Sequence, residues 1–107
     1  MQRCCPPVDV VQTVFEPSAT LFKALADPYR LTILATLASA DEVCVCDFTA
    51  ALPLNQPTVS HHLRVLRDAR LVTCERRGTW VYYRLAADAL KRLDDALGEV
   101  LRQKVAV

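Results

Sequence analysis

The chain has 107 residues, of which 52% are hydrophobic, and its formal net charge is only +1 at pH 7. A chain this short forms one small domain, so we expect a single domain over residues 1–107. Because it has neither a leader-like start nor an apolar run of the roughly 18 residues that span a bilayer, we expect a cytoplasmic protein without a membrane partner.

The positive charge is concentrated in one segment of the chain. Residues 1–54 contain three Lys or Arg and six Asp or Glu, which gives a net charge of −3. Residues 55–85 contain six Arg and two acidic residues, a net charge of +4, whereas residues 86–107 are balanced with four of each sign. A local excess of arginine is typical of a surface that contacts phosphates, although a solvated face can have the same composition.

An arm and two helices come first in chain order. Residues 1–15 show no clear period, and Pro6-Pro7 favours extended backbone, so we expect a flexible arm. The apolar spacing then predicts a helix over roughly residues 17–25. Asp27 can cap a second helix, because proline at position 28 suits the first helical turn.

A short helix and a longer amphipathic helix follow. The short helix is expected over residues 46–52, a turn over residues 53–55, and Asn55 can cap the next helix. At 100° per residue, Leu63 and Leu66 fall within about 40° of Val59, which predicts one buried face. The remaining sector of this helix is polar and basic and is expected to face solvent.

A β-hairpin and a last helix complete the predicted fold. Residues 71–77 and 80–85 are rich in β-branched and aromatic side chains, and Gly78 marks the turn between them. The last helix, over residues 87–105, has an apolar stripe at helical spacing, formed by Leu90, Leu93, Leu97 and Leu101. The fold class is therefore mainly α with a small β-hairpin, a winged helix-turn-helix of order ααααββα.

This arrangement predicts a DNA-binding surface. The second helix of a helix-turn-helix enters the major groove, and the hairpin tip can reach the neighbouring minor groove or backbone. Gln can form hydrogen bonds with adenine, Arg can bind guanine or phosphate, and the methyl group of Thr can contact the methyl group of thymine. The candidate DNA contacts are Gln56, Thr58, Ser60, His61, Arg64, Arg67, Arg76, Arg77 and Thr79.

Four of the five cysteines occur in two close pairs, Cys4-Cys5 and Cys44-Val45-Cys46. Thiols stay reduced in the cytoplasm, which favours metal binding or redox sensing over a disulfide framework. The start of a helix lowers the pKa of a thiol, but both sulfurs can face one ion only if Cys44 stays extended. Cys74, in the first hairpin strand, is expected to be a small buried residue.

A thiol enzyme is the alternative from another functional class. Neither cysteine pair has the C-x-x-C spacing of dithiol oxidoreductases. The chain has only two glycines and no Gly-rich cofactor loop. We therefore expect no enzymatic activity and no small organic substrate.

Four segments appear in the order of a known family: LFKALADPYRLTILATL, EVCVCDFTAAL, QPTVSHHLRVLRDARLV and ERRGTWVYYRL. Over roughly residues 21–85 the chain resembles the ArsR/SmtB family of metal-sensing winged helix-turn-helix repressors, and its arsenic-responsive type in particular. The resemblance implies a homodimer in which residues 87–105 form a dimerisation helix. It also implies that the metal-free dimer binds operator DNA and leaves it when metal binds.

The same resemblance implies a ligand set, since EVCVCD is similar to the family's ELCVCD thiolate motif. Arsenic-responsive members have a further cysteine where this chain has Thr49, so Cys4 and Cys5 are the available source of more thiols. Cys4, Cys5 and Cys44 suit As(III) or Sb(III), and adding Cys46 gives a four-sulfur set for Cd(II). The expected inducer is As(III) or Sb(III), with Cd(II) or Pb(II) sensing and thiol oxidation as alternatives.

Overall fold

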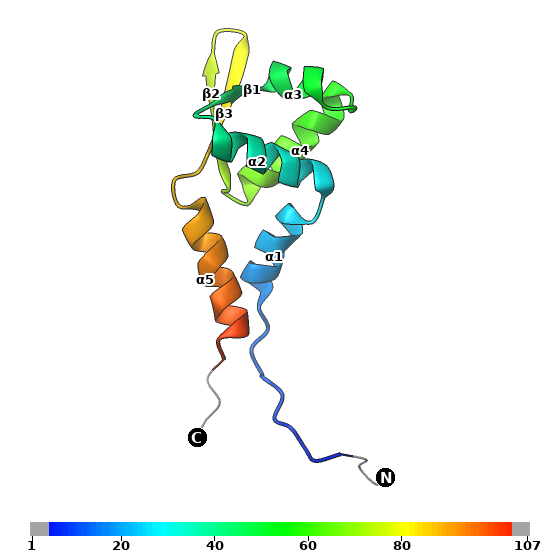
Figure 1. The fold of residues 1–107 in the computed structure, drawn as a ribbon, viewed down its shortest axis with the longest axis vertical. Helices are drawn as coiled ribbons and strands as arrows, with labels where there is room; N and C mark the ends of the chain where they lie inside the picture. The colour runs from blue at the N-terminus through cyan, green and yellow to red at the C-terminus, as the bar shows by residue number, and fades with distance from the viewer. Residues whose placement is uncertain (1–4, 104–107) are drawn as a thin grey trace.

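The computed structural model describes residues 5–103. Its elements are α1 (Glu16–Leu25), α2 (Pro28–Ser39), β1 (Val43–Cys44), α3 (Val45–Ala51), α4 (Gln56–Asp68), β2 (Val72–Arg77), β3 (Trp80–Leu85) and α5 (Ala89–Leu101). In Figure 1, α2, α3, α4 and the sheet form a body, α1 and α5 lie side by side below it, and the arm extends away from them. The predicted winged helix-turn-helix is confirmed, with one additional strand.

The additional strand, β1, makes the hairpin part of a three-stranded antiparallel sheet. The strand order is β1-β3-β2, so β3 lies in the centre. Cys44 of β1 is paired with Tyr82 of β3, and Arg77 is paired with Trp80 next to the turn. Gly78 adopts a positive φ of 62° in that turn, where a side chain would be strained. The pairing of β1 therefore attaches the segment before α3 to the wing, which is the β2–β3 hairpin.

Side-chain caps begin two of the helices as predicted. The carboxylate of Asp27 accepts hydrogen bonds from the backbone N–H groups of Tyr29 and Arg30, at 2.8 and 3.1 Å. The side-chain oxygen of Asn55 accepts from the backbone N–H of Thr58 at 3.1 Å. Each cap satisfies N–H groups that have no partner within the first helical turn. The caps consequently fix where α2 and α4 begin.

The core is formed around the apolar face of α4. Val59, Leu63 and Leu66 are fully buried, together with Ile33 of α2 and Leu71 before β2. This confirms the buried face predicted by the wheel and leaves the opposite face of α4 toward solvent. None of the helices within residues 5–103 has the length and apolarity that crossing a bilayer requires.

Two arginines join helices that are distant in sequence. Arg92 of α5 donates hydrogen bonds to the carbonyl oxygens of Ala69, at 2.8 Å, and Arg70, at the end of α4. Arg30 of α2 donates to the carbonyl oxygen of Ala24 at 2.8 Å, and its guanidinium lies 3.1 Å from Nδ1 of His62 in α4. Cations at these positions satisfy the unpaired carbonyl groups at helix C-termini. The ends of α1 and α4 are thereby held by side chains of other helices.

Candidate thiol site and nucleic-acid interface

Cys44 and Cys46 meet at the start of α3. Cys44 is the N-cap of that helix and has extended backbone, with φ −72° and ψ 143°. Its Sγ accepts a hydrogen bond from the backbone N–H of Cys46 at 3.4 Å, and the thiol of Cys46 donates to it across 2.6 Å. The expectation that an extended Cys44 lets both sulfurs face one point is confirmed. Together the two residues form a dithiol, a name we use below for this pair.

The pKa of the Cys46 thiol is shifted in the direction opposite to the one expected at the start of a helix. The pKa of the Cys46 thiol is raised, first because this thiol donates its hydrogen bond to Cys44, and then because of burial and the charges of Cys44 and Asp47. These local interactions act against the lowering of a thiol pKa that the start of a helix favours. Cys44 is buried whereas Cys46 is exposed, so a ligand can approach the pair from the side of Cys46.

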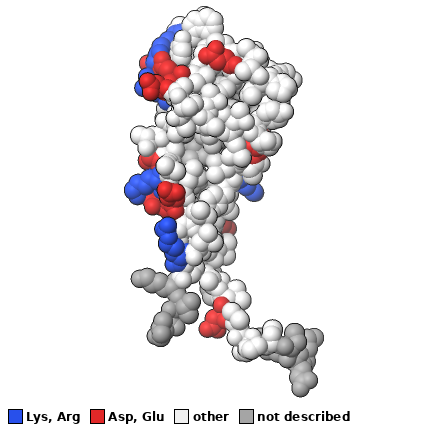
Figure 2. Space-filling view, in the orientation of Figure 1, with Lys and Arg blue, Asp and Glu red and all other residues white. Residues whose placement is uncertain are grey.

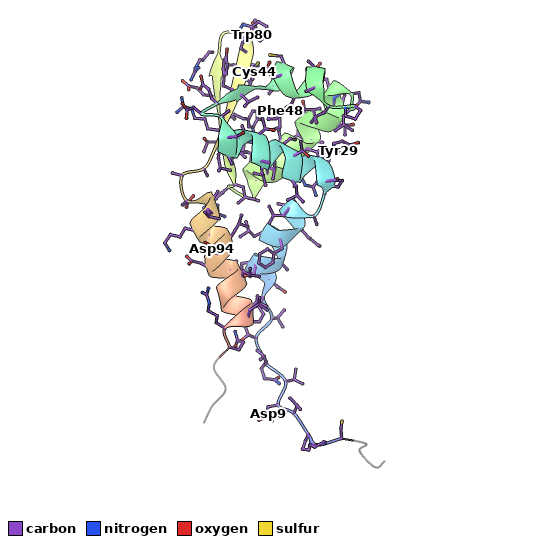
Figure 3. All side chains as sticks on the ribbon, viewed as in Figure 1. Asp9, Tyr29, Cys44, Phe48, Trp80 and Asp94 are labelled. Carbon is purple, nitrogen blue, oxygen red and sulfur yellow. The ribbon has the colours of Figure 1, made fainter. Side chains whose placement is uncertain are left out.

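The arm is far from the dithiol within one chain. Cys5 is exposed in the arm, and Cys4 lies outside the described residues. In Figure 3 the labelled Asp9 and Cys44 lie toward opposite ends of the long axis. Within residues 5–103 no group of three or more Cys, His, Asp and Glu side chains is assembled that could hold a metal ion. A single subunit therefore brings together Cys44 and Cys46 but not Cys5.

A cavity of about 590 Å³ opens beside the dithiol. Its lining includes both thiols, Gln56 and Ser60 from the first two turns of α4, and Arg76 and Trp80 from the wing. The pairing of β1 with β3 explains this arrangement, because it holds Cys44 next to the strand that begins with Trp80. The thiols and several candidate DNA contacts thus share one cavity, although they are separated in sequence.

The candidate DNA contacts lie on two exposed surfaces. On α4, Thr58 and Ser60 are half-buried, and on the wing Arg76 and Thr79 are exposed. His62, by contrast, is buried, and its ring contacts Arg30 of α2, so it belongs to the packing between helices rather than to the exposed face. Residues of both surfaces line the same cavity, so the polar, basic face of α4 and the arginine-bearing hairpin tip are next to each other, as one DNA duplex requires. The exposed candidates on α4 are Gln56, His61, Arg64 and Arg67.

Arg77, another candidate, lies within a cluster of charges at the base of the wing tip. Its guanidinium donates to both carboxylate oxygens of Glu42, at 2.7 and 2.8 Å, and to Glu75 at 2.9 Å. Arg84 also donates to Glu42, at 3.0 Å. Figure 2 shows basic and acidic side chains next to one another at this edge of the molecule. Arg77 therefore stabilises the connection between the wing and the segment before β1, and its contact with DNA stays a prediction.

This cluster makes the attachment of the wing sensitive to acid. The two arginines lower the pKa of Glu42 from 4.5 to about 2, first through the hydrogen bonds from Arg77 and then through those from Arg84. A carboxylate with a lowered pKa contributes stability that is complete above its unfolded pKa and is lost as the pH falls through its folded pKa. We expect the ion pairs to be intact above pH 4.5 and lost as the pH falls toward 2.

An NMR titration of the Glu42 carboxyl carbon tests this expectation, with a midpoint near 2 in the native protein. The matched variant Arg77→Gln removes the first cause and should move the midpoint upward, toward 4.5. A midpoint near 4.5 in the unaltered chain would show that the ion pairs do not form in solution.

Cys74 is exposed, so the expectation that it is a small buried residue is wrong. Only Val72 is buried in β2, which is an edge strand of the sheet, whereas the central strand β3 contains the buried Tyr83. The thiol of Cys74 lies 3.7 Å from the guanidinium of Arg67 on α4. Cys74 is separate from the dithiol and provides a matched control for it.

Comparison with known proteins identifies the family. Residues 27–73 match the model of the arsR family of bacterial regulatory proteins. An uncharacterized HTH-type transcriptional regulator of Methanocaldococcus jannaschii is 40% identical over 86 residues, which cover 80% of this chain and 97% of that protein. The arsenical resistance operon repressor of Escherichia coli is 45% identical over 80 residues, covering 71% of this chain and 68% of the repressor.

The fold comparison agrees with the sequence comparison. The crystal structure of a possible transcriptional regulator for arsenical resistance superimposes with a TM-score of 0.69 and 32% identity, covering 76% of this chain and 83% of that one. These relatives are transcriptional regulators rather than enzymes, which confirms the predicted class. The chain belongs to the arsR family of bacterial regulatory proteins and is a winged helix-turn-helix transcriptional repressor that binds DNA.

Proposed function

We propose that this repressor is released from its operator when As(III) or Sb(III) binds to its cysteine thiolates. The observation that carries the proposal is the meeting of the Cys44 and Cys46 sulfurs at the start of α3, immediately before the helix that faces DNA. Soft thiolate ligands favour soft metals and metalloids over Mg²⁺ or Ca²⁺. The E. coli relative is named an arsenical resistance operon repressor, which supports a metalloid as the inducer. Reduced thiols suit a cytoplasmic location.

The remaining thiols of the proposed site come from the arm. As(III) and Sb(III) take three sulfur ligands, and the dithiol of one subunit supplies two candidates. Cys44 is the preferred one, because its sulfur is held in place by a hydrogen bond from the backbone N–H of Cys46. Asp9 of the arm lies toward the opposite end of the chain from Cys44, so we propose that Cys4 and Cys5 reach the dithiol of a partner subunit. Ligands from both subunits would couple metalloid binding to the relative orientation of the two subunits.

The proposed assembly is a homodimer that pairs through α5. Leu90, Leu97 and Leu101 are 69%, 50% and 72% exposed in one subunit, although they lie at helical spacing on a single element. Exposed leucines in such a row are typical of a subunit interface. Two α4 helices related by a dimer axis would then be about one DNA turn apart, roughly 34 Å, as two operator half-sites require.

Measuring operator release by each ion tests the proposed inducer. We expect As(III) and Sb(III) to dissociate the unaltered protein from its operator at lower concentrations than Cd(II) or Pb(II). Cys4→Ser and Cys5→Ser are expected to respond only at much higher As(III) concentrations, because each removes one of three sulfurs. A normal response of both variants contradicts the proposed arm ligands. Release by mild peroxide without any metalloid would instead support the redox alternative.

A further inference from the structure

An acidic residue, Glu42, lies at the centre of the charge cluster on this DNA-binding domain. Its two carboxylate oxygens accept hydrogen bonds from Arg77 at 2.7 and 2.8 Å, and the second oxygen also accepts one from Arg84 at 3.0 Å. Glu42 immediately precedes β1, whereas Arg77 is the last residue of β2, next to the turn at the wing tip. The contact therefore joins the segment that leads into β1 to the far end of the wing.

The register of the sheet separates Arg77 from its neighbour Arg76. Side chains alternate along a strand, so these two consecutive arginines lie on opposite faces of the wing. Arg76 lines the cavity that α4 also borders. The guanidinium of Arg77 instead lies over the ring of Tyr82, 4.6 Å from its centroid, and binds the carboxylate of Glu42. Arg76 is consequently on the side of α4, whereas Arg77 is on the side of Glu42.

The ion pair attaches the wing at a place that backbone pairing does not reach. β1 has two residues, and its pairing with β3 ends at Cys44, which lies opposite Tyr82. Between Tyr82 and the tip, the described part of the chain pairs β3 with β2 alone. The bidentate bond from Arg77 to Glu42 adds an attachment nearer the tip, with the directional geometry that the planar guanidinium provides.

We propose that Glu42 is a positioning residue for operator binding, which acts through Arg77 to hold the wing tip where it meets the duplex. The apparent affinity of a protein falls with the fraction of molecules that are in the binding-competent conformation. A wing released from Glu42 spends part of its time away from that position, so operator affinity falls. An acidic side chain thereby favours the binding of a polyanion. This role concerns DNA binding alone and does not depend on which inducer acts at the thiols.

Two neighbouring carboxylates provide the test, because Asp41→Asn and Glu42→Gln each remove one negative charge with little change of shape. Asp41 is exposed, and among residues 5–103 it takes no part in the ion pairs of the wing. The overall electrostatic field predicts that both substitutions strengthen DNA binding slightly. We expect Asp41→Asn to do so by less than about threefold, because exposed charges are screened by salt. Glu42→Gln is expected instead to weaken operator binding by about fivefold, the effect of one well-aligned surface ion pair.

The salt dependence of operator binding separates positioning from simple neutralisation of arginines. If Glu42 only kept Arg77 and Arg84 from binding phosphates, Glu42→Gln would bind the operator more tightly. Each added phosphate contact would also make the slope of log K against log salt more negative by about 0.9. Positioning predicts weaker binding with an unchanged slope. Tighter binding with a steeper slope would overturn it.

Arg77→Lys tests the same contact from the other side. Lysine keeps the positive charge that attracts a phosphate but cannot form the bidentate bond to Glu42. If Arg77 acts through Glu42, this variant should bind the operator about as weakly as Glu42→Gln, and the double variant should be no weaker than either. An operator affinity of Arg77→Lys equal to that of the unaltered protein would show that only the charge of Arg77 matters and would contradict the proposal.

Trp80 reports the mobility of the wing directly, because it is the single tryptophan of the chain and is paired with Arg77 across the hairpin. In time-resolved anisotropy without DNA, the fast component of the Trp80 decay should grow in Glu42→Gln and in Arg77→Lys. It should stay unchanged in Asp41→Asn. If Glu42→Gln weakens operator binding but keeps the Trp80 decay of the unaltered protein, the loss has another cause and the inference is wrong.

Discussion

Cys44→Ser is expected to abolish the release of operator DNA by arsenite. Allosteric effectors typically change a partner's affinity by about 5- to 150-fold, and we expect a decrease within this range for the unaltered protein. Cys44 is the buried member of the dithiol and the N-cap of α3, where its sulfur accepts two hydrogen bonds. A serine oxygen can still accept at the helix start but does not bind soft arsenic. The ratio of operator affinities with and without arsenite should therefore be close to one.

The measurement is operator binding by fluorescence anisotropy at fixed salt, with and without arsenite. Cys74→Ser is the matched control, because it removes another thiol of the same domain that is exposed on the wing and not part of the dithiol. This control should keep the full arsenite response. Retention of the response in Cys44→Ser would refute the assignment of the dithiol as the inducer site.

Arg64→Ala is expected to weaken operator binding by about a hundredfold. Arg64 is exposed on α4, on the face opposite the fully buried Leu63 and Leu66. A bidentate contact from arginine to guanine contributes roughly 1–3 kcal/mol of discrimination. In a dimer each subunit loses one such contact, which corresponds to about two factors of ten. The loss should be confined to operators that keep guanine at the contacted position.

Lys91→Ala provides the charge control for this substitution. Lys91 also carries a positive charge, but it lies on α5 and pairs with Asp95 at 2.8 Å. Removing the Lys91 charge should change operator affinity by less than about threefold, because this charge affects DNA only through the overall electrostatic field of the protein. A similar loss in both variants would mean that Arg64 contributes net charge and does not read a base.

Local patterns in the sequence predicted the helices and their caps well. The buried face of α4 follows from the spacing of Val59, Leu63 and Leu66, and the cap at Asn55 from residue type alone. Both features depend on interactions within a few residues, which periodicity and capping preferences record. An extended Cys44 was only a condition for two sulfurs to face one ion, and the structure meets that condition.

Features that depend on distant residues were not predictable in this way. β1 has only two residues, too few for any periodic pattern, and its pairing with β3 brings Trp80 to the thiols. The ion pairs of Glu42 join residues 35 and 42 positions apart in sequence. The exposure of Cys74 depends on the place of β2 at the edge of the sheet. Each of these outcomes is decided by tertiary packing rather than by local preference.

The two hydrogen bonds from Arg92 to the end of α4 have a mechanical consequence. They connect the end of α4, which is proposed to enter the major groove, to α5, the helix through which two subunits are proposed to pair. A rotation of one protomer relative to the other then moves α4 together with α5 as one rigid unit. A small rotation at the α5 interface would change the spacing of the two α4 N-termini relative to the helical repeat of DNA. A small rearrangement of this interface is therefore sufficient to lower the affinity for the operator.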